Sequence, residues 1–194
     1  MKKIILLIIL QTTYLYAMGF EATPIPEDAY VISTYLDEQR FLAQYPIEDM
    51  DYIKSISVKY RIPVRFLYRQ HYIESKLNPS AVRQERNGSV SVGYSQINSV
   101  NWDHFQDKFN GGKKINYYDK YQNIEIGAIY MRYLVEHLNG DWLGAYMCYC
   151  WGIGNFNSDK RIPKQVIEYS FSIYYGTDYT PCVEILWGAV EEMI

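Results

Sequence analysis

The sequence lacks a basic cluster and a large excess of charge of either sign. Among its 194 residues, 19 are Lys or Arg and 22 are Asp or Glu, which gives a formal net charge of −3. Proteins that bind nucleic acid usually carry a strongly basic surface, because they must neutralise phosphates. We therefore expect no nucleic-acid partner.

Recognisable metal and nucleophile motifs are also missing. None of the three histidines, His71, His104 and His137, belongs to a His-Glu-x-x-His pattern, the helical spacing that binds zinc. No serine or cysteine lies in a nucleophile-elbow pattern. The glycine pair Gly111-Gly112 precedes Lys113 but lacks the upstream glycine of a phosphate-binding loop. We therefore predict no metal site and no cofactor.

Cysteine is scarce, and its count is odd. The three are Cys148, Cys150 and Cys182. In an exported protein, an odd count leaves at least one thiol unpaired. Residues two apart on a helix point away from each other, so a disulfide would join Cys182 to Cys148 or to Cys150. The alternative is three buried thiols that act as small apolar groups.

The hydrophobic run at the N-terminus is too short to span a bilayer. Lys2 and Lys3 precede the apolar residues 4–10, and Ala17 ends the segment with a small residue. This pattern predicts a signal peptide over residues 1–17, with an uncleaved anchor as the alternative. The protein is then periplasmic or otherwise exported, and membrane-associated if the anchor is retained. We expect an N-terminal extension over 18–49 and one domain over 50–194.

Helical spacing of apolar residues dominates that domain, which predicts a mostly α fold with one small β-hairpin. Asn87-Gly88 and the alternating residues 89–92 predict the hairpin. Asn123 is expected to cap one helix and Asp141 the next, and the segment 152–155 is expected to be a turn. The predicted helices cover residues 52–60, 63–74, 123–138, 142–151 and 162–175.

Glu74 is the first candidate for chemistry. It follows Leu67 by one heptad, and so shares a helix face with an apolar run that ends at Ile73. Asn78-Pro79 predicts the end of this helix, because a residue before proline avoids the helical region. A carboxyl group held among apolar side chains favours its neutral form, as a general acid near neutral pH requires.

A second carboxyl group with a matching role is not evident from the sequence. The segment Gly93-Tyr94-Ser95-Gln96-Ile97-Asn98 is rich in hydrogen-bonding groups but has no acid. The only acid between Glu74 and this segment is Glu85, which stands between Arg83 and Arg86 in a polar stretch. This arrangement favours a mechanism that uses a single carboxyl group.

Several motifs together resemble one family. They are Glu74-Ser75 with Asn78-Pro79, then Asn87-Gly88-Ser89, then the segment 93–99, the helix from Asn123, and Tyr149-Cys150-Trp151-Gly152. In this order and spacing, over roughly residues 50–175, the sequence is similar to the lytic transglycosylase domain related to goose-type lysozyme. The Asn-Gly-Ser insertion and the Gln-Ile-Asn-Ser continuation resemble the small members that accompany secretion and conjugation machines.

The resemblance implies a lysozyme-like domain with its hairpin beside the active-site cleft, and a secreted enzyme whose partner is the glycan of peptidoglycan. It would cleave between N-acetylmuramic acid and N-acetylglucosamine, with Glu74 first as general acid and then as base, and leave 1,6-anhydro ends. Gln96 is expected beside the acid, and Tyr149 over its carboxyl group. Secretion or conjugation machinery is the implied protein partner. Further residues expected to bind substrate are Ser75, Ser95 and Asn98.

The sequence departs from the family pattern at a few positions, and two other functions remain. Tyr94-Ser95 replaces the usual Leu-Met before the glutamine, and Cys150 replaces an asparagine. A hydrolytic lysozyme would need a second carboxylate across the cleft, for which Asp103 and Glu125 are available. A catalytically inactive wall-binding component of a secretion apparatus is the other alternative.

Overall fold

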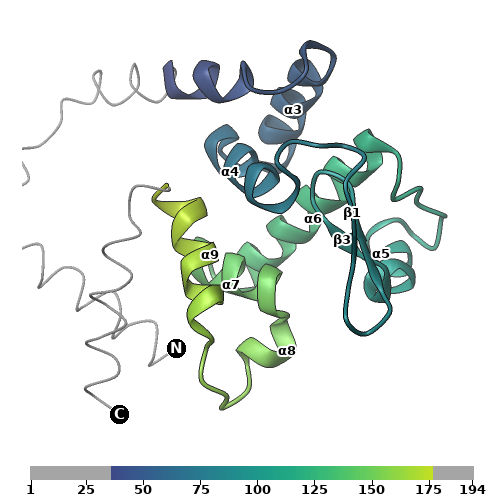
Figure 1. Ribbon diagram of the computed structural model, residues 1–194, viewed down its shortest axis with the longest axis vertical. Coiled ribbons are helices and arrows are strands. Elements are labelled where there is room, and N and C mark those ends of the chain that lie inside the picture. Colours follow the sequence, from purple (N-terminus) through teal and green to yellow (C-terminus); the bar gives the residue numbers. More distant parts are fainter. Residues whose placement is uncertain (1–35, 177–194) are drawn as a thin grey trace, which may run out of the picture. The chain divides into compact units, whose positions relative to one another are not determined.

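A computed structural model describes residues 36–176 of the chain. The predicted signal peptide or anchor, most of the predicted extension and Cys182 lie outside these residues. Within these described residues, seven α-helices and one short 3₁₀ helix have defined bounds, and Figure 1 shows their arrangement. These are α3 (Ile47–Tyr60), α4 (Val64–Ser75), η1 (Ser99–Asn101), α5 (Trp102–Phe109), α6 (Lys120–His137), α7 (Trp142–Trp151), α8 (Ile153–Phe156) and α9 (Lys164–Tyr174).

The small β-structure is a three-stranded antiparallel sheet in the order β1-β2-β3. The strands are β1 (Val82–Gln84), β2 (Val90–Val92) and β3 (Ile97–Asn98). Val82 pairs with Val92 and Gln84 with Val90, so the Asn87-Gly88 turn closes the predicted hairpin. Gly88 has a φ of 84°, a left-handed conformation that glycine adopts without steric cost. Ser91 then pairs with Asn98, which adds the third strand.

Two hydrophobic cores hold the described residues together. The larger core joins α3, α4, α6 and α7, and its most deeply buried members include Ile53, Leu67, Met131 and Tyr146. The smaller core fixes the sheet on α5 and α6. Its buried residues are Val92, Ile97, Phe105, Ile115, Tyr117 and Ile126. Because α6 contributes to both cores, it is the element on which the sheet and the helices are positioned together.

The structure confirms the helix bounds around α4, α7 and α9 to within a few residues, and Asp141 caps α7 through a 2.9 Å hydrogen bond from the Gly144 amide. The cap of α6 was predicted wrongly. Asp119 is the cap, since its side chain accepts from the Gln122 amide at 2.9 Å, and Asn123 lies inside the helix. The segment 152–155 was predicted as a turn, but residues 153–156 form the short helix α8.

The helix α4 also ends for a different reason from the one predicted. Lys76 and Leu77 adopt left-handed conformations with φ of 54° and 58°, so the helix stops before the Asn78-Pro79 pair is reached. Glu74 still falls in the last turn, as predicted. Within residues 36–176, no helix has the length and apolar character that a membrane span requires.

Candidate active site

Glu74 lies in the last turn of α4, where the chain leaves the helix. Its neighbours on the buried side of the same helix, Gln70 and His71, are each 1% exposed, whereas Glu74 itself is half-buried. The left-handed Lys76 turns the backbone immediately afterwards. The carboxyl group is thereby held by a rigid helix and surrounded mostly by protein, with an open side toward solvent.

Burial governs the ionisation of Glu74. Desolvation of the carboxyl group raises its pKa from 4.5 to about 7, because burial disfavours the charged form. The Tyr169 hydroxyl donates a 2.6 Å hydrogen bond to Glu74 Oε1, which opposes the rise. Near neutral pH both the acid and the carboxylate are therefore populated, as a group that must donate and later accept a proton requires.

Two charged residues of the sheet region also act on Glu74. The positive charge of Arg83 lowers the pKa of Glu74 and the negative charge of Glu85 raises it. Glu85 Oε1 accepts hydrogen bonds from Ser91 Oγ at 2.7 Å and from Arg83 Nε at 2.9 Å, and both lower its own pKa. Glu85 is therefore an ionised carboxylate whose field reaches Glu74. No role for Glu85 was predicted from the sequence.

The two acids considered for a second catalytic group are engaged elsewhere. Glu125 Oε1 accepts from Lys59 Nζ at 2.6 Å and from the Tyr60 hydroxyl at 2.8 Å. Asp103 lines a separate cavity beside α5. Neither of them is among the groups that shift the pKa of Glu74.

Tyr149, expected over the carboxyl group, donates its hydroxyl to the Ser95 carbonyl at 2.8 Å. Burial, followed by the charge of Glu74, holds the pKa of Tyr149 well above its usual value, so it stays a neutral phenol close to the acid. The tyrosine that hydrogen-bonds Glu74 is Tyr169 from α9, which sequence reasoning missed. One sequence feature could have pointed to Tyr169. It lies on the same face of α9 as the buried Val166, and a tyrosine hydroxyl that is buried needs a hydrogen-bond partner.

Gln96 lies in the loop between β2 and β3 and is 7% exposed. It adopts a left-handed conformation with a φ of 46°. Its side-chain amide donates to the carbonyls of Gly93 at 3.0 Å and Ala81 at 3.3 Å. The bond to Ala81 ties the loop to the segment that leads into β1, the strand that contains Arg83.

The three weaker substrate candidates make hydrogen bonds within the fold. Ser75 Oγ donates to the His71 carbonyl at 2.9 Å, and Ser95 Oγ lies 3.3 Å from His71 Nε2. Ser95 is completely buried. Asn98 accepts from the Val100 amide and donates to Ser89 Oγ and Ser91 Oγ. These contacts give all three residues structural roles within the fold.

The remaining sulfur and nitrogen groups near the site are neutral at physiological pH. Burial lowers the pKa of His71 to about 3, and the Tyr45 hydroxyl lies 3.0 Å from its Nδ1. Desolvation, followed by the charge of Glu74, raises the pKa of the Cys150 thiol to about 11.

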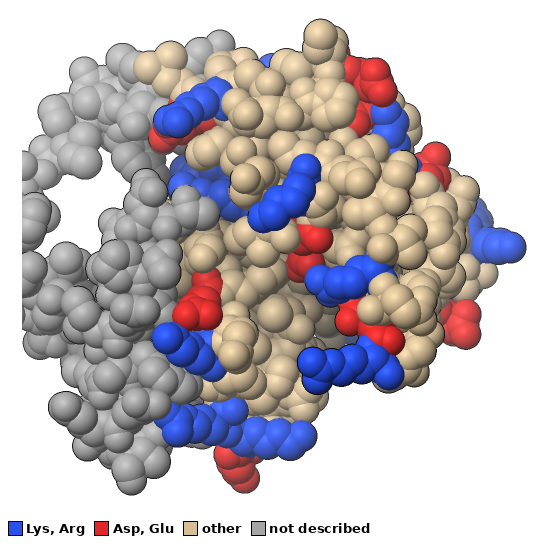
Figure 2. All heavy atoms as spheres, in the orientation of Figure 1, with Lys and Arg blue, Asp and Glu red and all other residues tan. Residues whose placement is uncertain are grey.

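Within residues 36–176, no three His, Cys, Asp or Glu side chains gather closely enough to hold a metal ion. Figure 2 shows acidic and basic side chains interspersed over the visible face.

Comparisons with known proteins place this arrangement in a family. A family model described as the transglycosylase SLT domain matches residues 51–171. The X-ray structure of an inactive mutant of the lytic transglycosylase Slt from Pseudomonas aeruginosa matches with a TM-score of 0.50 and 17% sequence identity. The match covers 70% of this chain and 22% of that one, so the present chain corresponds to about a fifth of the larger protein.

The search of curated proteins finds no match. At 17% identity the structural likeness establishes the fold alone, and it confirms the predicted mostly helical, lysozyme-like architecture. The family model, in contrast, covers more than half of the chain, including α4 and α7. On this evidence the chain belongs to the transglycosylase SLT domain family.

Proposed function

We propose that this chain is a peptidoglycan lytic transglycosylase in which Glu74 is the single acid and base. The bond cleaved is the β-1,4 linkage between N-acetylmuramic acid and N-acetylglucosamine. The observation that carries the proposal is the environment of Glu74, whose desolvation raises its pKa to about 7 while Tyr169 occupies one of its two oxygens. Family membership supplies the substrate class.

In the first step, protonated Glu74 transfers its proton to the glycosidic oxygen, and the bond from that oxygen to C1 breaks. The Tyr169 hydroxyl donates to Oε1, which leaves Oε2 to carry the proton. Charge then appears on Glu74 in a desolvated place, where the same hydrogen bond stabilises it. Glu85 remains ionised because Ser91 and Arg83 hold it in that form.

In the second step, the Glu74 carboxylate takes the proton of the muramic C6 hydroxyl, and the C6 oxygen bonds to C1. The hydroxyl belongs to the bound sugar, so the attack is intramolecular and needs no captured water. The product carries a 1,6-anhydro ring, and Glu74 is again protonated. No external acid, base or cofactor is consumed in the cycle.

The other proposed site residues position substrate around this acid. Gln96 and Tyr149 are the main candidates, supported by a rigid loop for Gln96 and by the electrostatic coupling of Tyr149 with Glu74. Three further residues are proposed to support substrate binding, because their side chains fix the backbone near the cleft. They are Ser75, Ser95 and Asn98.

Hydrolysis is the second candidate function, and the position of Glu85 is the observation that favours it. A glycosidase that adds water needs a second carboxylate across the cleft, as base or nucleophile. Glu85 is ionised and its charge is felt at Glu74. Its two hydrogen bonds on Oε1 engage it within the sheet, which supports an electrostatic role over an attack on water.

The test is mass spectrometry of the fragments released from purified cell-wall sacculi. The proposal expects muramic ends lighter by one water than lysozyme products and without a reducing end. Glu74→Gln should lower turnover by about 10²–10⁴-fold, the usual contribution of general acid–base catalysis. Glu136→Gln, an exposed glutamate of α6 paired with Arg132, is the matched control and should keep wild-type turnover.

Predominantly reducing products that disappear in Glu85→Gln would replace the proposal by hydrolysis. Glycan binding without any cleavage, unchanged in Glu74→Gln, would instead identify an inactive wall-binding component. The proposal includes export to the wall compartment by the predicted segment 1–17. It also includes a secretion or conjugation machine as partner, for which the resemblance in the 87–99 region is the support.

A further inference from the structure

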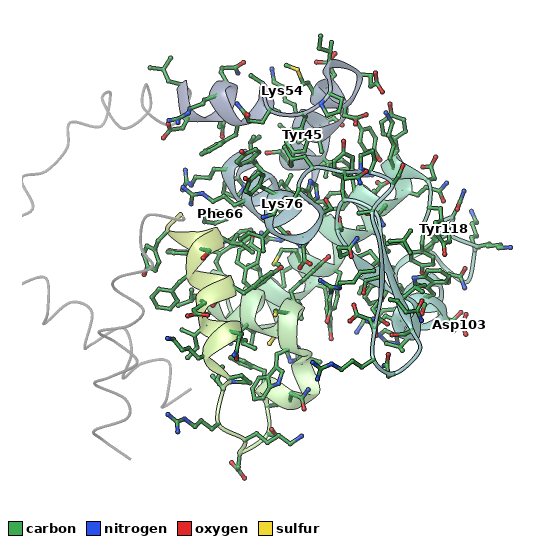
Figure 3. The ribbon with its side chains drawn as sticks, in the orientation of Figure 1. Tyr45, Lys54, Phe66, Lys76, Asp103 and Tyr118 are labelled. Carbon is green, nitrogen blue, oxygen red and sulfur yellow. The ribbon has the colours of Figure 1, made fainter. Side chains whose placement is uncertain are left out.

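A cavity lies beside α5. Its lining contains neither Glu74 nor any residue that shifts the pKa of Glu74. Its volume is about 890 Å³, within the range of about 300–1,000 Å³ that is usual for ligand sites. We call it the α5 groove; it is lined by α5, the segment 112–118 and the first turn of α6. In Figure 3, its residues Tyr118 and Asp103 lie on the side of the sheet away from α9.

The aromatic wall of the α5 groove is rigid. The Trp102 and Tyr117 rings stack with centroids 4.8 Å apart and planes 6° apart. The Tyr117 hydroxyl donates to the Trp102 carbonyl at 2.7 Å, and Trp102 Nε1 donates to the Ile97 carbonyl at 3.4 Å. Tyr118 meets Trp102 edge-on at 5.9 Å and is 59% exposed. An exposed ring is therefore presented beside a preorganised wall, so little conformational freedom is lost on binding.

Amide groups supply the polar part of the lining. Gln106 Oε1 accepts from the Ile115 amide at 3.1 Å, and Gln122 Oε1 accepts from the Asn116 amide at 3.0 Å. Each carbonyl end is thus held by the loop, and each NH₂ group has two N–H donors that face away from that bond. Gln106 Nε2 makes one long contact, 3.4 Å to Asp103 Oδ1, which a better acceptor can replace.

Charge in the groove is balanced. Asp103 and Lys114, one of each sign, line it. A phosphate or an acidic peptide would meet a carboxylate as well as an ammonium group, so the lining favours a neutral ligand with many acceptors. Sugar rings fit this description, because their apolar C–H faces stack on aromatic rings and their hydroxyl and acetamide oxygens accept from amides.

We propose that the α5 groove binds a neutral N-acetylated glycan strand at a site separate from the catalytic cleft. The inference rests on the proposed function in one respect, since peptidoglycan supplies such a strand. A neighbouring cavity of about 240 Å³ shares Ile115 and Gln122 with the α5 groove and is also lined by Phe109, Tyr60 and Glu125. The Glu125 carboxylate is paired with Lys59 at 2.6 Å. Two adjacent cavities suit several sugar units in a row. The groove would hold the enzyme on its insoluble substrate while the Glu74 side cleaves another strand.

The test follows the indole N–H resonance of Trp102 by NMR in the full chain carrying Glu74→Gln, so that the ligand is not consumed. The probe is the hexamer of β-1,4-linked N-acetylglucosamine. We expect this resonance to shift on titration, and Tyr118→Ala to weaken the fitted affinity about tenfold, the loss of a typical aromatic contact. Tyr118→Phe keeps the ring and should keep the affinity. Tyr72→Ala, another exposed tyrosine at 42%, is the matched control and should behave as the parent.

A Trp102 resonance that stays in place at saturating hexamer would overturn the inference, as would an unchanged affinity in Tyr118→Ala. A shift produced equally by a stem peptide without sugar would also overturn it. Because the readout does not depend on cleavage, 1,6-anhydro products from sacculi together with an immobile Trp102 signal would reject the groove and leave the proposed function standing. A shifted Trp102 resonance without 1,6-anhydro products would reject the proposed function and leave glycan binding in the α5 groove standing.

Discussion

At the scale of single residues, four opposing influences set the pKa of Glu74. Desolvation raises its pKa, the Tyr169 hydrogen bond and the charge of Arg83 lower it, and the charge of Glu85 raises it again. Desolvation outweighs the others, and the pKa settles near 7. Each of the smaller influences comes from one side chain, so each can be removed by one substitution with a known sign.

Tyr169→Phe tests the hydrogen bond. Its loss removes a contact that favours the ionised form, so the pKa of Glu74 should rise above its present value of about 7. The alkaline limb of the rate profile, where Glu74 must still be protonated, should move upward by about one to two pH units, since a hydrogen bond to a charged group is worth about 1.5–3 kcal/mol. The measurement is turnover of sacculi as a function of pH.

Tyr60→Phe provides the control for Tyr169→Phe, because it removes the same kind of phenol–carboxylate bond from Glu125. It should leave the alkaline limb in place. An unmoved limb in Tyr169→Phe would mean that the group titrating in that limb is not Glu74.

Glu85→Gln and Arg83→Gln should displace the same limb in opposite directions. Removing the carboxylate lowers the pKa of Glu74, and it also frees the Arg83 charge, which acts the same way. Removing the guanidinium raises the pKa of Glu74. We expect displacements of a few tenths of a unit to about one unit, as for partly exposed charges. An NMR titration of a ¹³C-labelled Glu74 carboxyl reads them directly, and displacements of the same sign would show that the charges act only through the fold.

The sequence predicted the place of Glu74 in the last turn of its helix and its raised pKa, but not the side chains that act on it. The apolar stretch before Glu74 and the loop after it are local, so they are visible in the chain. Tyr169 lies 95 residues away, and no local pattern links its hydroxyl to the acid. Glu85 was discounted because it stands between two arginines, whereas the fold turns its carboxylate toward Ser91 and brings its charge near Glu74.

At the scale of elements, the loop between β2 and β3 is held by one side chain of α6. Asn123 is completely buried, accepts from the Ser95 amide at 2.9 Å, and donates to the carbonyls of Val92 at 2.8 Å and Tyr117 at 3.0 Å. Gly93 packs directly on this amide, with a φ of 74° and room for no Cβ, since one would lie 2.4 Å from Asn123 Cγ. The loop that carries Gln96 is positioned in this way.

Asn123→Ala should therefore destabilise the fold strongly. It leaves one amide and two carbonyl groups of the backbone buried without this partner, and each such group costs about 1–3 kcal/mol. We expect a total loss of about 2–4 kcal/mol in the free energy of unfolding, because the cavity admits some water. Urea denaturation measures it. Asn157→Ala, at an exposed asparagine after α8, is the matched control and should change stability by less than about 0.5 kcal/mol. Similar values for the two variants would show that the Asn123 bonds do not hold the loop.

The cap of α6 was predicted wrongly because Asn123 has another role, which is to hold the loop between β2 and β3. Asn and Asp are both strong helix caps, and the sequence offers Asp119 and Asn123 one turn apart. Choosing between them requires knowing that the sheet will lie against the second one. Elements whose signals are local were predicted with nearly correct bounds, as for α7 with Asp141 at its start.

At the scale of the whole molecule, the Glu74 carboxyl group should lower stability at neutral and alkaline pH. The pKa of Glu74 is about 7 in the folded chain and near 4.5 in the unfolded chain. The folded state therefore binds more protons between these values, and stability falls as the pH rises through that window. Glu125 shows the opposite pattern, since hydrogen bonds from Lys59 and Tyr60 outweigh its desolvation and lower its pKa.

Glu74→Gln removes this titration while keeping the shape of the side chain and an acceptor for the Tyr169 hydroxyl. A shift from 4.5 to about 7 corresponds to about 3 kcal/mol, so at pH 8 the variant should be more stable than the parent by up to about this amount. Below pH 4.5 the carboxyl group is protonated in both states, and the gain should vanish. Urea denaturation at pH 4, 6 and 8 gives the three points.

Glu125→Gln should behave in the opposite way, losing stability above pH 4.5, because its carboxylate is stabilised in the folded chain. A buried acid with a raised pKa lowers the stability of the folded protein, and such a loss of stability is common at active sites. If Glu74→Gln is no more stable than the parent at pH 8, the carboxyl group is not desolvated in the folded protein. The reason for assigning it the acid role would then be gone, whatever the products released from the cell wall.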